Sequence, residues 1–421
     1  MHSEHTVQGI GITALAQRYG TPLFVYDGEV LRRQFQQLRD ALDERVEMFY
    51  SLKANPNISI CALLHSLGAR AEVSSMVELM TARQAGVAPS DIIFLGPGKS
   101  DEELAACLDE QIYAIVCESL GELARIDELA AARGRTADVA LRVNPSFTSV
   151  GSGLTMSGKP RQFGIDADQL FAAPDLVGRH PHVRVMGVHV YLGTRILAEA
   201  DIIDNTARIL SLADELAERL GFALDLVDVG GGLGVAYFAK EDDLDHKELV
   251  SGLNPLFDDF AARHPGARLA MELGRYLAAH CGTYVARVRY VKSSMGERFA
   301  VTDGGTHHHM AAVGIGSFVK RNFPMVLLNR MDEPADEPWQ VCGPLCTPND
   351  TLAKDVLLPS VRSGDLIGVL RSGAYGPTAS PGRFLSHGYP VEVLVDDGVD
   401  HLVRERDQPA DLLRPQRLYT A

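Results

Sequence analysis

Lys53 is the residue whose type and position most directly suggest chemistry. It follows the mostly apolar, strand-like stretch from Val46 to Leu52, and Asn55-Pro56 stops that stretch directly afterwards. An amine at the end of a buried strand is expected to lose hydration. This loss lowers its pKa and favours the neutral, nucleophilic form that Schiff-base chemistry requires. The alternative is a lysine that covers apolar surface with its stem and keeps its charged head in water.

Other polar residues end or follow apolar stretches in the same way. They comprise two acids, two guanidinium groups, an amide, two ring side chains and a glycine run: Glu72, Glu272, Arg142, Arg275, Asn144, His189, Tyr191 and Gly230, Gly231 and Gly232. Keeping such a set at one edge of a fold for structural reasons alone would be costly, because charged groups near a core lose hydration. We interpret the set as a candidate site.

Eight apolar, strand-like stretches position these residues. They lie near residues 46–52, 69–74, 91–95, 112–117, 138–143, 183–190, 224–229 and 268–272. Most intervals between them have the apolar spacing of amphipathic helices. This alternation predicts an α/β fold, a (β/α)8 TIM barrel, in which active sites form at the carboxyl ends of the strands. An open doubly wound sheet is the alternative, because Gly230 to Gly234 could also form a dinucleotide-binding loop.

From Thr283 onward, short β-rich stretches separated by Gly, Pro and Asp turns replace the alternation. We therefore predict two domains. Residues 28–282 form the cofactor-binding barrel, and residues 283–421 form a C-terminal all-β domain, a sandwich or barrel. The early strand at residues 22–27 is expected to join the second domain instead of the barrel.

Composition indicates a globular protein and limits its partners. Hydrophobic residues make up 46% and charged residues 23% of the chain, and the formal net charge is −15. This charge disfavours nucleic acid or an anionic membrane as the main partner. The sequence has no signal peptide pattern and no segment as long as a membrane span, and its six cysteines include no Cys-x-x-Cys pair. We expect a cytoplasmic protein with reduced thiols.

The candidate site suits a planar, phosphorylated cofactor with a carbonyl group, and pyridoxal 5′-phosphate (PLP) fits each part. Lys53 would hold the carbonyl carbon, Gly230 to Gly232 would approach the phosphate with their N–H groups, and Glu272 would pair with the ring nitrogen. A carboxylate there keeps the pyridine protonated, which suits loss of CO₂ better than racemisation. A plain tight turn is the alternative for the glycines.

Six motifs resemble the fold-type III PLP-dependent decarboxylases, the group of diaminopimelate and ornithine decarboxylases. The resemblance runs from about residue 20 to residue 395, with the motifs in the family's order. The motifs are Tyr50–Asn55, Gly187–Thr194, Asp228–Gly232, Glu272–Arg275, Cys342–Asp350 and Gly373–Gly376.

The resemblance implies roles for individual residues. Lys53 carries the cofactor, and the residues around it are Glu72, Arg142, His189, Tyr191, Thr194, Gly230, Gly231, Gly232, Glu272, Arg275 and Tyr375. Among these, Tyr375, Thr194 and Arg275 join the glycines at the phosphate. Tyr191 takes the place of the family's ring-stacking histidine. Cys346 resembles the family's catalytic thiol, which one subunit of a homodimer supplies to its partner's barrel, with Asp350 nearby.

The departures from the family pattern concern the substrate. Thr347 stands where the diaminopimelate enzymes have a glutamate that binds the far amino group, so that salt bridge cannot form. The stretch from Asp303 to Met310 also lacks their Arg-rich substrate segment. Four motifs instead resemble a branch with exosortase-associated and butirosin-type enzymes, the latter acting on a carrier-tethered amino acid: Asp303–His309, Arg321–Pro324, Gly343–Pro348 and Thr378–Pro381.

These observations predict a homodimeric enzyme that removes the α-carboxylate of an amino acid, either free or tethered to an acyl carrier protein, in a biosynthetic pathway. The substrate is expected near Thr347, Asp350 and His308. We expect no metal site, because three consecutive histidines on a strand, His307 to His309, would alternate faces. Diaminopimelate decarboxylase, a non-catalytic PLP-binding homologue and an amino-acid racemase are the alternatives.

Overall fold

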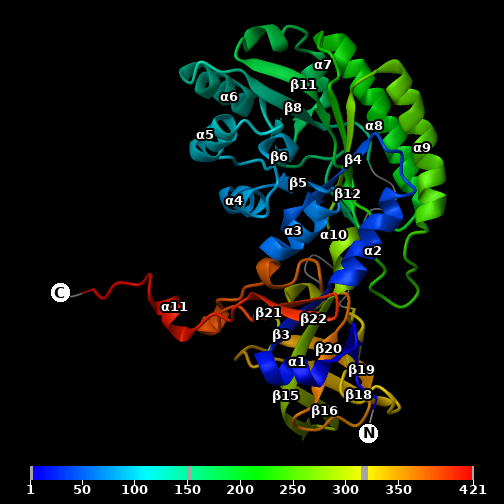
Figure 1. Cartoon of the computed structure of the whole chain (residues 1–421), viewed down its shortest axis with the longest axis vertical. Helices are drawn as coiled ribbons and strands as arrows, with labels where there is room; N and C mark the ends of the chain where they lie inside the picture. Colours follow the sequence, from blue (N-terminus) through cyan, green and yellow to red (C-terminus); the bar gives the residue numbers. More distant parts are fainter. Residues whose placement is uncertain (1–2, 149–150, 152, 314–320, 420–421) are drawn as a thin grey trace. The chain divides into compact units, whose positions relative to one another are not determined.

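The computed structural model describes residues 3–148, 151, 153–313 and 321–419, which divide into two compact units (Figure 1). The first, called the barrel unit here, comprises the described residues of 33–236 and 242–277. The second, called the β unit, comprises the described residues of 1–32, 237–241 and 278–421. Among the described helices, none combines the length and apolar character needed to cross a membrane.

In the barrel unit, eight parallel strands close into a barrel. They are β4 (Val46–Ser51), β5 (Arg70–Val73), β6 (Ile92–Phe94), β7 (Ala114–Cys117), β8 (Ala137–Asn144), β11 (Val183–His189), β13 (Leu226–Gly231) and β14 (Arg268–Leu273). Each pairs with the next in this order, and β14 pairs with β4 to close the ring. The predicted TIM-type barrel is confirmed, and the closure excludes the open doubly wound sheet.

Helices precede, separate and follow the barrel strands (Figure 1). They are α2 (Gly28–Arg39), α3 (Ile58–Ser66), α4 (Met76–Gln84), α5 (Asp101–Glu110), α6 (Leu120–Ala132), α7 (Ala167–Phe171), α8 (Glu199–Leu220), α9 (His246–Arg263) and α10 (Arg275–Ala278). Of these, α3 to α9 are the ones that lie between strands. Serine side chains begin three of them: Ser75, Ser100 and Ser119 accept N–H groups in the first turns of α4, α5 and α6. Each cap fixes where a loop from a strand end becomes a helix.

Apolar side chains fill the barrel. One buried cluster takes residues from seven of the eight strands and from the end of β6: Phe49, Ile93, Leu95, Ala114, Val116, Ala140, Met186, Leu226 and Ala270. Because side chains of a strand alternate faces, the residues between these point outward to the helices. The polar residues that remain are thereby confined to the strand ends.

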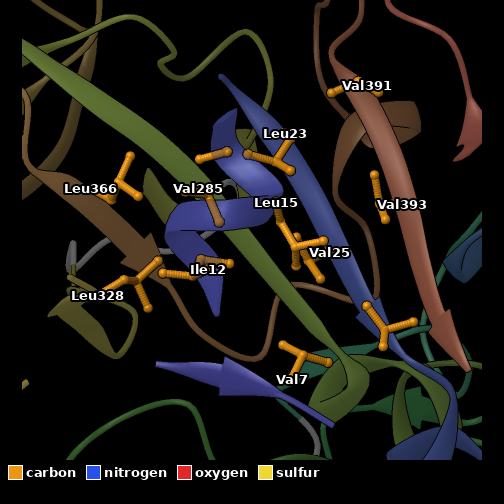
Figure 2. Close-up of a cluster of buried hydrophobic side chains, with 12 residues drawn as sticks. Val7, Ile12, Leu15, Leu23, Val25, Val285, Leu328, Leu366, Val391 and Val393 are labelled. Carbon is orange, nitrogen blue, oxygen red and sulfur yellow. The ribbon is translucent and has the colours of Figure 1, made fainter. Parts of the chain in front are cut away.

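The β unit consists mainly of strands. They are β1 (Thr6–Val7), β2 (Ile10–Gly11), β3 (Leu23–Asp27), β15 (Gly282–Ser294), β16 (Glu297–Thr302), β17 (Met325–Leu327), β18 (Glu337–Cys342), β19 (Thr351–Leu358), β20 (Leu366–Val369), β21 (Val391–Asp396) and β22 (Val399–Arg404). The early strand β3 pairs with β15 and β21. The helix α1 (Ile12–Tyr19) packs Ile12 and Leu15 into the unit's buried apolar cluster, with Val25, Val285 and Val393 (Figure 2).

Candidate active site

Strand ends bring the candidate residues of the barrel unit to one rim. All eight strands are parallel, so their carboxyl ends meet at the same end of the barrel. Lys53 lies in a 3₁₀ turn, Leu52–Ala54, that follows β4, whereas Glu72 and Glu272 lie near the carboxyl ends of β5 and β14. His189 is the last residue of β11.

Lys53 is held beside a buried acid. Its Nζ lies 3.1 Å from Glu72 Oε2, and the Glu72 side chain is fully enclosed while 36% of the Lys53 side chain is exposed. The hydroxyls of Ser51 and Ser74 donate to the two oxygens of Glu72. Burial raises the pKa of Glu72, and the charge of Lys53 opposes that shift. The amine is thus partly open to a ligand and anchored on its inner side.

Glu272 is enclosed beside His189 and Asp228. His189 Nε2 lies 3.0 Å from Glu272 Oε1, and a ring nitrogen of His189 and one oxygen of each acid lie within 4.8 Å of one another. Burial by itself would raise the pKa of Glu272, but the charge and hydrogen bond of His189, with Lys53 and Arg142, lower it to about 2. Burial and the Glu272 charge raise the pKa of Asp228 well above its usual value. Glu272 is therefore the ionised acid of the pair, and Asp228 the protonated one.

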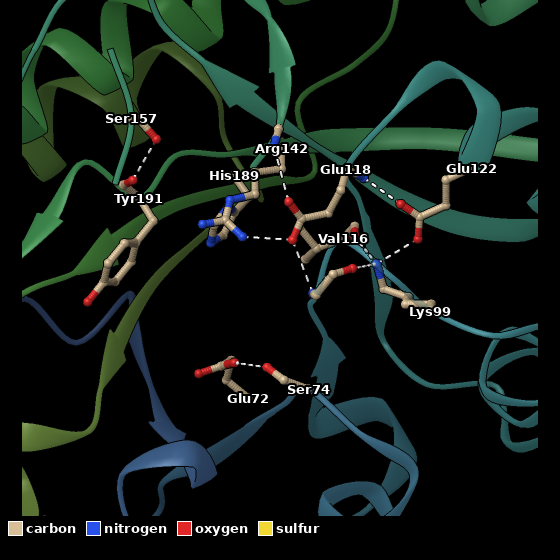
Figure 3. A network of polar contacts seen from close by, with 12 residues as sticks. Glu72, Ser74, Lys99, Val116, Glu118, Glu122, Arg142, Ser157, His189 and Tyr191 are labelled. Atoms are coloured by element: carbon tan, nitrogen blue, oxygen red, sulfur yellow. Dashed lines mark hydrogen bonds and ion pairs between the residues drawn. The ribbon is translucent and has the colours of Figure 1, made fainter. Parts of the chain in front are cut away.

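A buried network fixes Arg142 (Figure 3). Arg142 donates to Glu118 Oε1 at 2.7 Å, and the Glu118 oxygens also accept the N–H groups of Gly96 and Gly164. Lys99, 1% exposed, donates to Glu122 at 2.6 Å and to the carbonyl oxygens of Gly96 and Val116. Every charge here has a partner of opposite sign, which is the condition for keeping such groups buried.

The glycine run ends β13 in a position that other residues could not occupy. Gly230 and Gly232 have φ of 68° and 90°, in the region that favours glycine. A Cβ on Gly230, Gly231 or Gly232 would overlap the backbone of Val190, Glu272 or Gly193 respectively. Close packing of neighbouring strand ends therefore explains the three glycines on its own, and their contact with a phosphate stays a prediction.

Of three further predicted cofactor residues, Tyr191 lies beside Lys53, and Thr194 and Arg275 lie in the segments that follow β11 and β14. The ring centroid of Tyr191 lies 5.4 Å from Lys53 Nζ. Thr194 lies in the short strand β12 (Gly193–Thr194), and Arg275 begins α10.

Tyr375 belongs to the β unit and has φ of 56°. A bulky side chain rarely adopts this backbone conformation, and strain of this kind is commonest at ligand sites. The contact of Tyr375 with the cofactor phosphate stays a prediction.

Cys346 lies on the turn that joins β18 to β19 in the β unit, and it is exposed. The turn takes its shape from Asp350, which is 3% exposed. Asp350 Oδ1 accepts the N–H and hydroxyl of Thr306 at 2.7 and 3.0 Å, and Oδ2 accepts the N–H of Leu345 at 2.7 Å. These contacts make Asp350 a residue that ties the Cys346 turn to the segment after β16.

Thr347, predicted to contact the substrate, uses its hydroxyl within the same turn, where Oγ1 accepts the N–H of Asn349 at 3.3 Å. The three histidines, expected on a strand, instead lie in and directly after a turn that follows β16, and Asp350 holds the first residue of that turn, Thr306. His308 Nε2 donates to the Gly388 carbonyl oxygen at 2.9 Å, and its Nδ1 lies 3.3 Å from the Tyr284 hydroxyl. Burial lowers the pKa of His308 well below its usual value, so the ring is neutral.

Comparison with known proteins identifies the family. Residues 29–279 match the family model of the pyridoxal-dependent decarboxylases, pyridoxal binding domain. This chain belongs to the pyridoxal-dependent decarboxylases. The match covers the barrel, including Lys53 and Glu272.

Full-length relatives agree with this assignment. An L-glutamyl-[BtrI acyl-carrier protein] decarboxylase from Niallia circulans is 38% identical over 409 residues, covering 96% of each chain. A diaminopimelate decarboxylase from Methanothermobacter thermautotrophicus is 30% identical over 424 residues, covering 98% of this chain and 95% of the relative. The crystal structure of a diaminopimelate decarboxylase from M. jannaschii in co-complex with L-lysine superposes with a TM-score of 0.89 and 26% identity, covering 99% of this chain and 96% of that one.

The barrel residues of this decarboxylase fit PLP. Lys53 offers a partly exposed amine beside the Tyr191 ring. Glu272 Oε2 accepts no hydrogen bond from any described residue, so it suits a protonated pyridine nitrogen. When bound, PLP supplies an electron sink for the pair of electrons left by the departing CO₂. The chain's own contribution is to hold the Glu272 carboxylate in place through His189.

Several supporting residues of the decarboxylase were missed at the sequence level. Asp228 and Ser51 belong to the predicted motifs without an assigned role, and Glu118, Lys99 and Ser74 lie outside those motifs. The available signal was position: Glu118 directly follows the buried strand β7, and Asp228 is an acid inside the otherwise apolar start of β13. Their partners come from neighbouring strands, and pairing of this kind is not visible along one sequence.

Proposed function

We propose that this decarboxylase removes the α-carboxylate of an amino acid, of the glutamyl type, that is attached as a thioester to an acyl carrier protein. The supporting observation is the 38% identity, over 96% of both chains, to an enzyme named for that substrate. This chain is less similar to the diaminopimelate decarboxylases, with 28% to 30% identity in the relatives compared.

The turn around Cys346 supports the same choice. Thr347 supplies a neutral hydroxyl, already accepting the Asn349 N–H group. Asp350, the acid within this turn, is buried and accepts hydrogen bonds at both oxygens. Residues 343–350 therefore offer no available carboxylate to a substrate ammonium group, which diaminopimelate would require.

The test measures CO₂ release from three substrates: an L-glutamyl carrier-protein thioester, free L-glutamate and meso-diaminopimelate. We expect the carrier thioester to be turned over with a kcat/KM at least about 100-fold above either free amino acid, because remote binding energy is lost from the free substrates. Comparable kcat/KM with meso-diaminopimelate, with lysine as product, would establish the second candidate, which the diaminopimelate relatives favour. Exchange of the α-hydrogen without CO₂ release would indicate a racemase.

The proposal includes a homodimer in which Cys346 of one subunit serves the barrel of the other. Its support is the exposure of Cys346 on a turn together with the family's shared sites, which the sequence motifs imply. Mixed dimers test it: Lys53→Ala and Cys346→Ala subunits, each inactive alone, should regain about a quarter of the wild-type activity when mixed and reassembled. No recovery, with mixed dimers verified by mass, would place both residues in one subunit's site.

We also propose a cytoplasmic location. All six cysteines are unpaired thiols, four of them buried, as expected for a protein of a reducing compartment. Cell fractionation with detection of the tagged chain in the soluble cytoplasmic fraction tests this, and recovery from an oxidising compartment would contradict it.

A further inference from the structure

The β unit contains a cavity that the proposed reaction leaves without a role. Its volume is about 400 Å³, and it is lined by Ala312, Arg321, Asn322 and the first five residues of β19, Thr351 to Asp355. The part of the cavity lining that β19 supplies starts at Thr351, the residue after Asp350. The turn that carries Cys346 therefore leads directly into the cavity wall. From Thr351 to Asp355 the strand extends roughly 13 Å at ~3.3 Å per residue, so the cavity wall is elongated.

The motif Arg321-Asn322-Phe323-Pro324 builds one side of this cavity. The Asn322 side chain donates to the Lys354 carbonyl oxygen at 2.6 Å and accepts the Lys354 N–H at 3.0 Å. Phe323 is buried against Tyr237, with ring centroids 4.5 Å apart, and lies edge-on to Phe238. The backbone of Lys354 is therefore tied to Asn322, the residue next to Arg321.

The cavity wall carries excess positive charge. The Arg321 side chain is 56% exposed, lies over the Phe238 ring at 5.2 Å and is 3.4 Å from Glu241 Oε1. Lys354 is exposed and forms no ion pair with any residue that the structure describes. The lining acid, Asp355, already accepts a hydrogen bond from Gln340 Nε2 at 2.7 Å. Arg321 is shared with Glu241, which lies outside the lining, whereas Lys354 has no acid partner among the described residues. The pair of cations suits a phosphate group, and arginine is well shaped to bind one.

We propose that this cavity binds the phosphate end of the carrier protein's phosphopantetheine arm. Arg321 and Lys354 bind the phosphate, and Ala312, Leu352 and Ala353 contact the apolar part of the arm. The arm then runs along β19 toward the turn with Cys346, where the amino acid end reacts. This inference rests on the proposed function, because only a carrier-bound substrate brings such an arm. A lone inorganic phosphate offers the same charge, so the experiment separates the two.

The kinetic test compares L-glutamyl-phosphopantetheine with L-glutamyl-pantetheine, which lacks the phosphate. For the wild type we expect kcat/KM at least about ten-fold higher with the phosphorylated substrate, since charge-assisted hydrogen bonds contribute at this level. The double variant Arg321→Ala/Lys354→Ala should lose that ten-fold advantage and leave the pantetheine substrate unchanged. Lys292→Ala, an exposed lysine on β15, serves as the matched control and should keep the advantage.

Equal losses on both substrates, or no loss on either, would overturn the inference. A direct binding measurement separates it from the proposed function, because it needs no turnover. In calorimetry, phosphopantetheine should bind the wild type at least about ten-fold more tightly than either pantetheine or inorganic phosphate, and the double variant should remove this preference. Inorganic phosphate binding as tightly as phosphopantetheine would make this a general anion site. Failure of every carrier thioester to release CO₂, with the binding preference intact, would reject the proposed reaction only.

Discussion

The barrel unit and the β unit hold their candidate catalytic residues by different physical means. Lys53 stands among enclosed ionisable groups, where Glu72, Glu272 and Asp228 differ in protonation because burial and neighbouring charges shift their pKa values in opposite directions. Cys346 is exposed on a turn, and one buried carboxylate, Asp350, fixes that turn by accepting backbone and hydroxyl groups. The barrel thus controls charge, whereas the β unit controls position.

The largest effect should come from the barrel. Lys53→Ala removes the amine that holds the cofactor carbonyl, so we expect loss of the cofactor's near-visible absorbance and a fall in CO₂ release of at least about 1,000-fold. Lys292→Ala should change neither measurement. Wild-type absorbance in the Lys53 variant would assign the cofactor to another amine.

Asp350→Ala tests whether the β unit acts through position alone. Without Asp350, the buried N–H groups of Thr306 and Leu345 lose their acceptor, at a cost of roughly 1–3 kcal/mol each. We expect kcat to fall about 10- to 100-fold as Cys346 is misplaced, while cofactor absorbance stays unchanged.

Asp350→Asn keeps one acceptor oxygen and should fall between Asp350→Ala and the wild type. Asp336→Ala, in an exposed segment, is the control. Loss of the cofactor absorbance in the Asp350→Ala variant would contradict the separation of roles between the two units.

Asp228 tests the charge control within the barrel. Asp228→Ala removes the buried acid whose oxygen lies within 4.8 Å of Glu272, so we expect PLP to bind about ten-fold more weakly, because the Glu272 carboxylate is then held less firmly. Asp228→Asn keeps a donor and should bind PLP as the wild type does. Cofactor fluorescence titration measures both affinities, and equal weakening in the two variants would show that the carboxyl group itself is required and that a neutral amide of similar shape does not replace it.

The pKa shifts of Asp228 and Glu272 predict how the melting temperature of the cofactor-free protein depends on pH. The folded pKa of Asp228 is raised above ~3.9, the usual value. Its neutral form therefore contributes stability fully below that value, and the contribution is lost as pH rises through the folded pKa. As pH rises through the folded pKa of Asp228, the melting temperature of the Asp228→Asn variant should therefore fall less than that of the wild type. Glu272, lowered to about 2, contributes the opposite trend, which appears only as pH falls toward that value.

The smallest effect is expected at His308. Both ring nitrogens have partners inside the β unit, so His308→Gln should lower the melting temperature by about 2–4 °C while KM changes less than about two-fold. His401→Gln, at an exposed position, is the control. A large rise in KM with unchanged stability would restore His308 as a residue that contacts the substrate.

Strand ends were predictable from the sequence because the barrel repeats one local pattern. Each buried strand needs a continuous apolar stretch, so an acid or amine at its end is conspicuous, as Lys53, Glu72 and Glu272 are. The histidine turn was predicted wrongly as a strand, because the carboxylate that holds Thr306 at the start of that turn belongs to Asp350, 44 residues away. The segment Tyr237–Glu241 belongs to the β unit although it interrupts the barrel sequence, for the same kind of long-range reason.

The sequence by itself determined the fold class, the family and the residue types at the site, since these follow from local patterns and motifs. Only the tertiary structure decided which acid is protonated, which glycines packing requires, and which carboxylate shapes the Cys346 turn. Those properties depend on burial and on partners from neighbouring strands. Neither can be inferred from how far apart two residues lie along the chain.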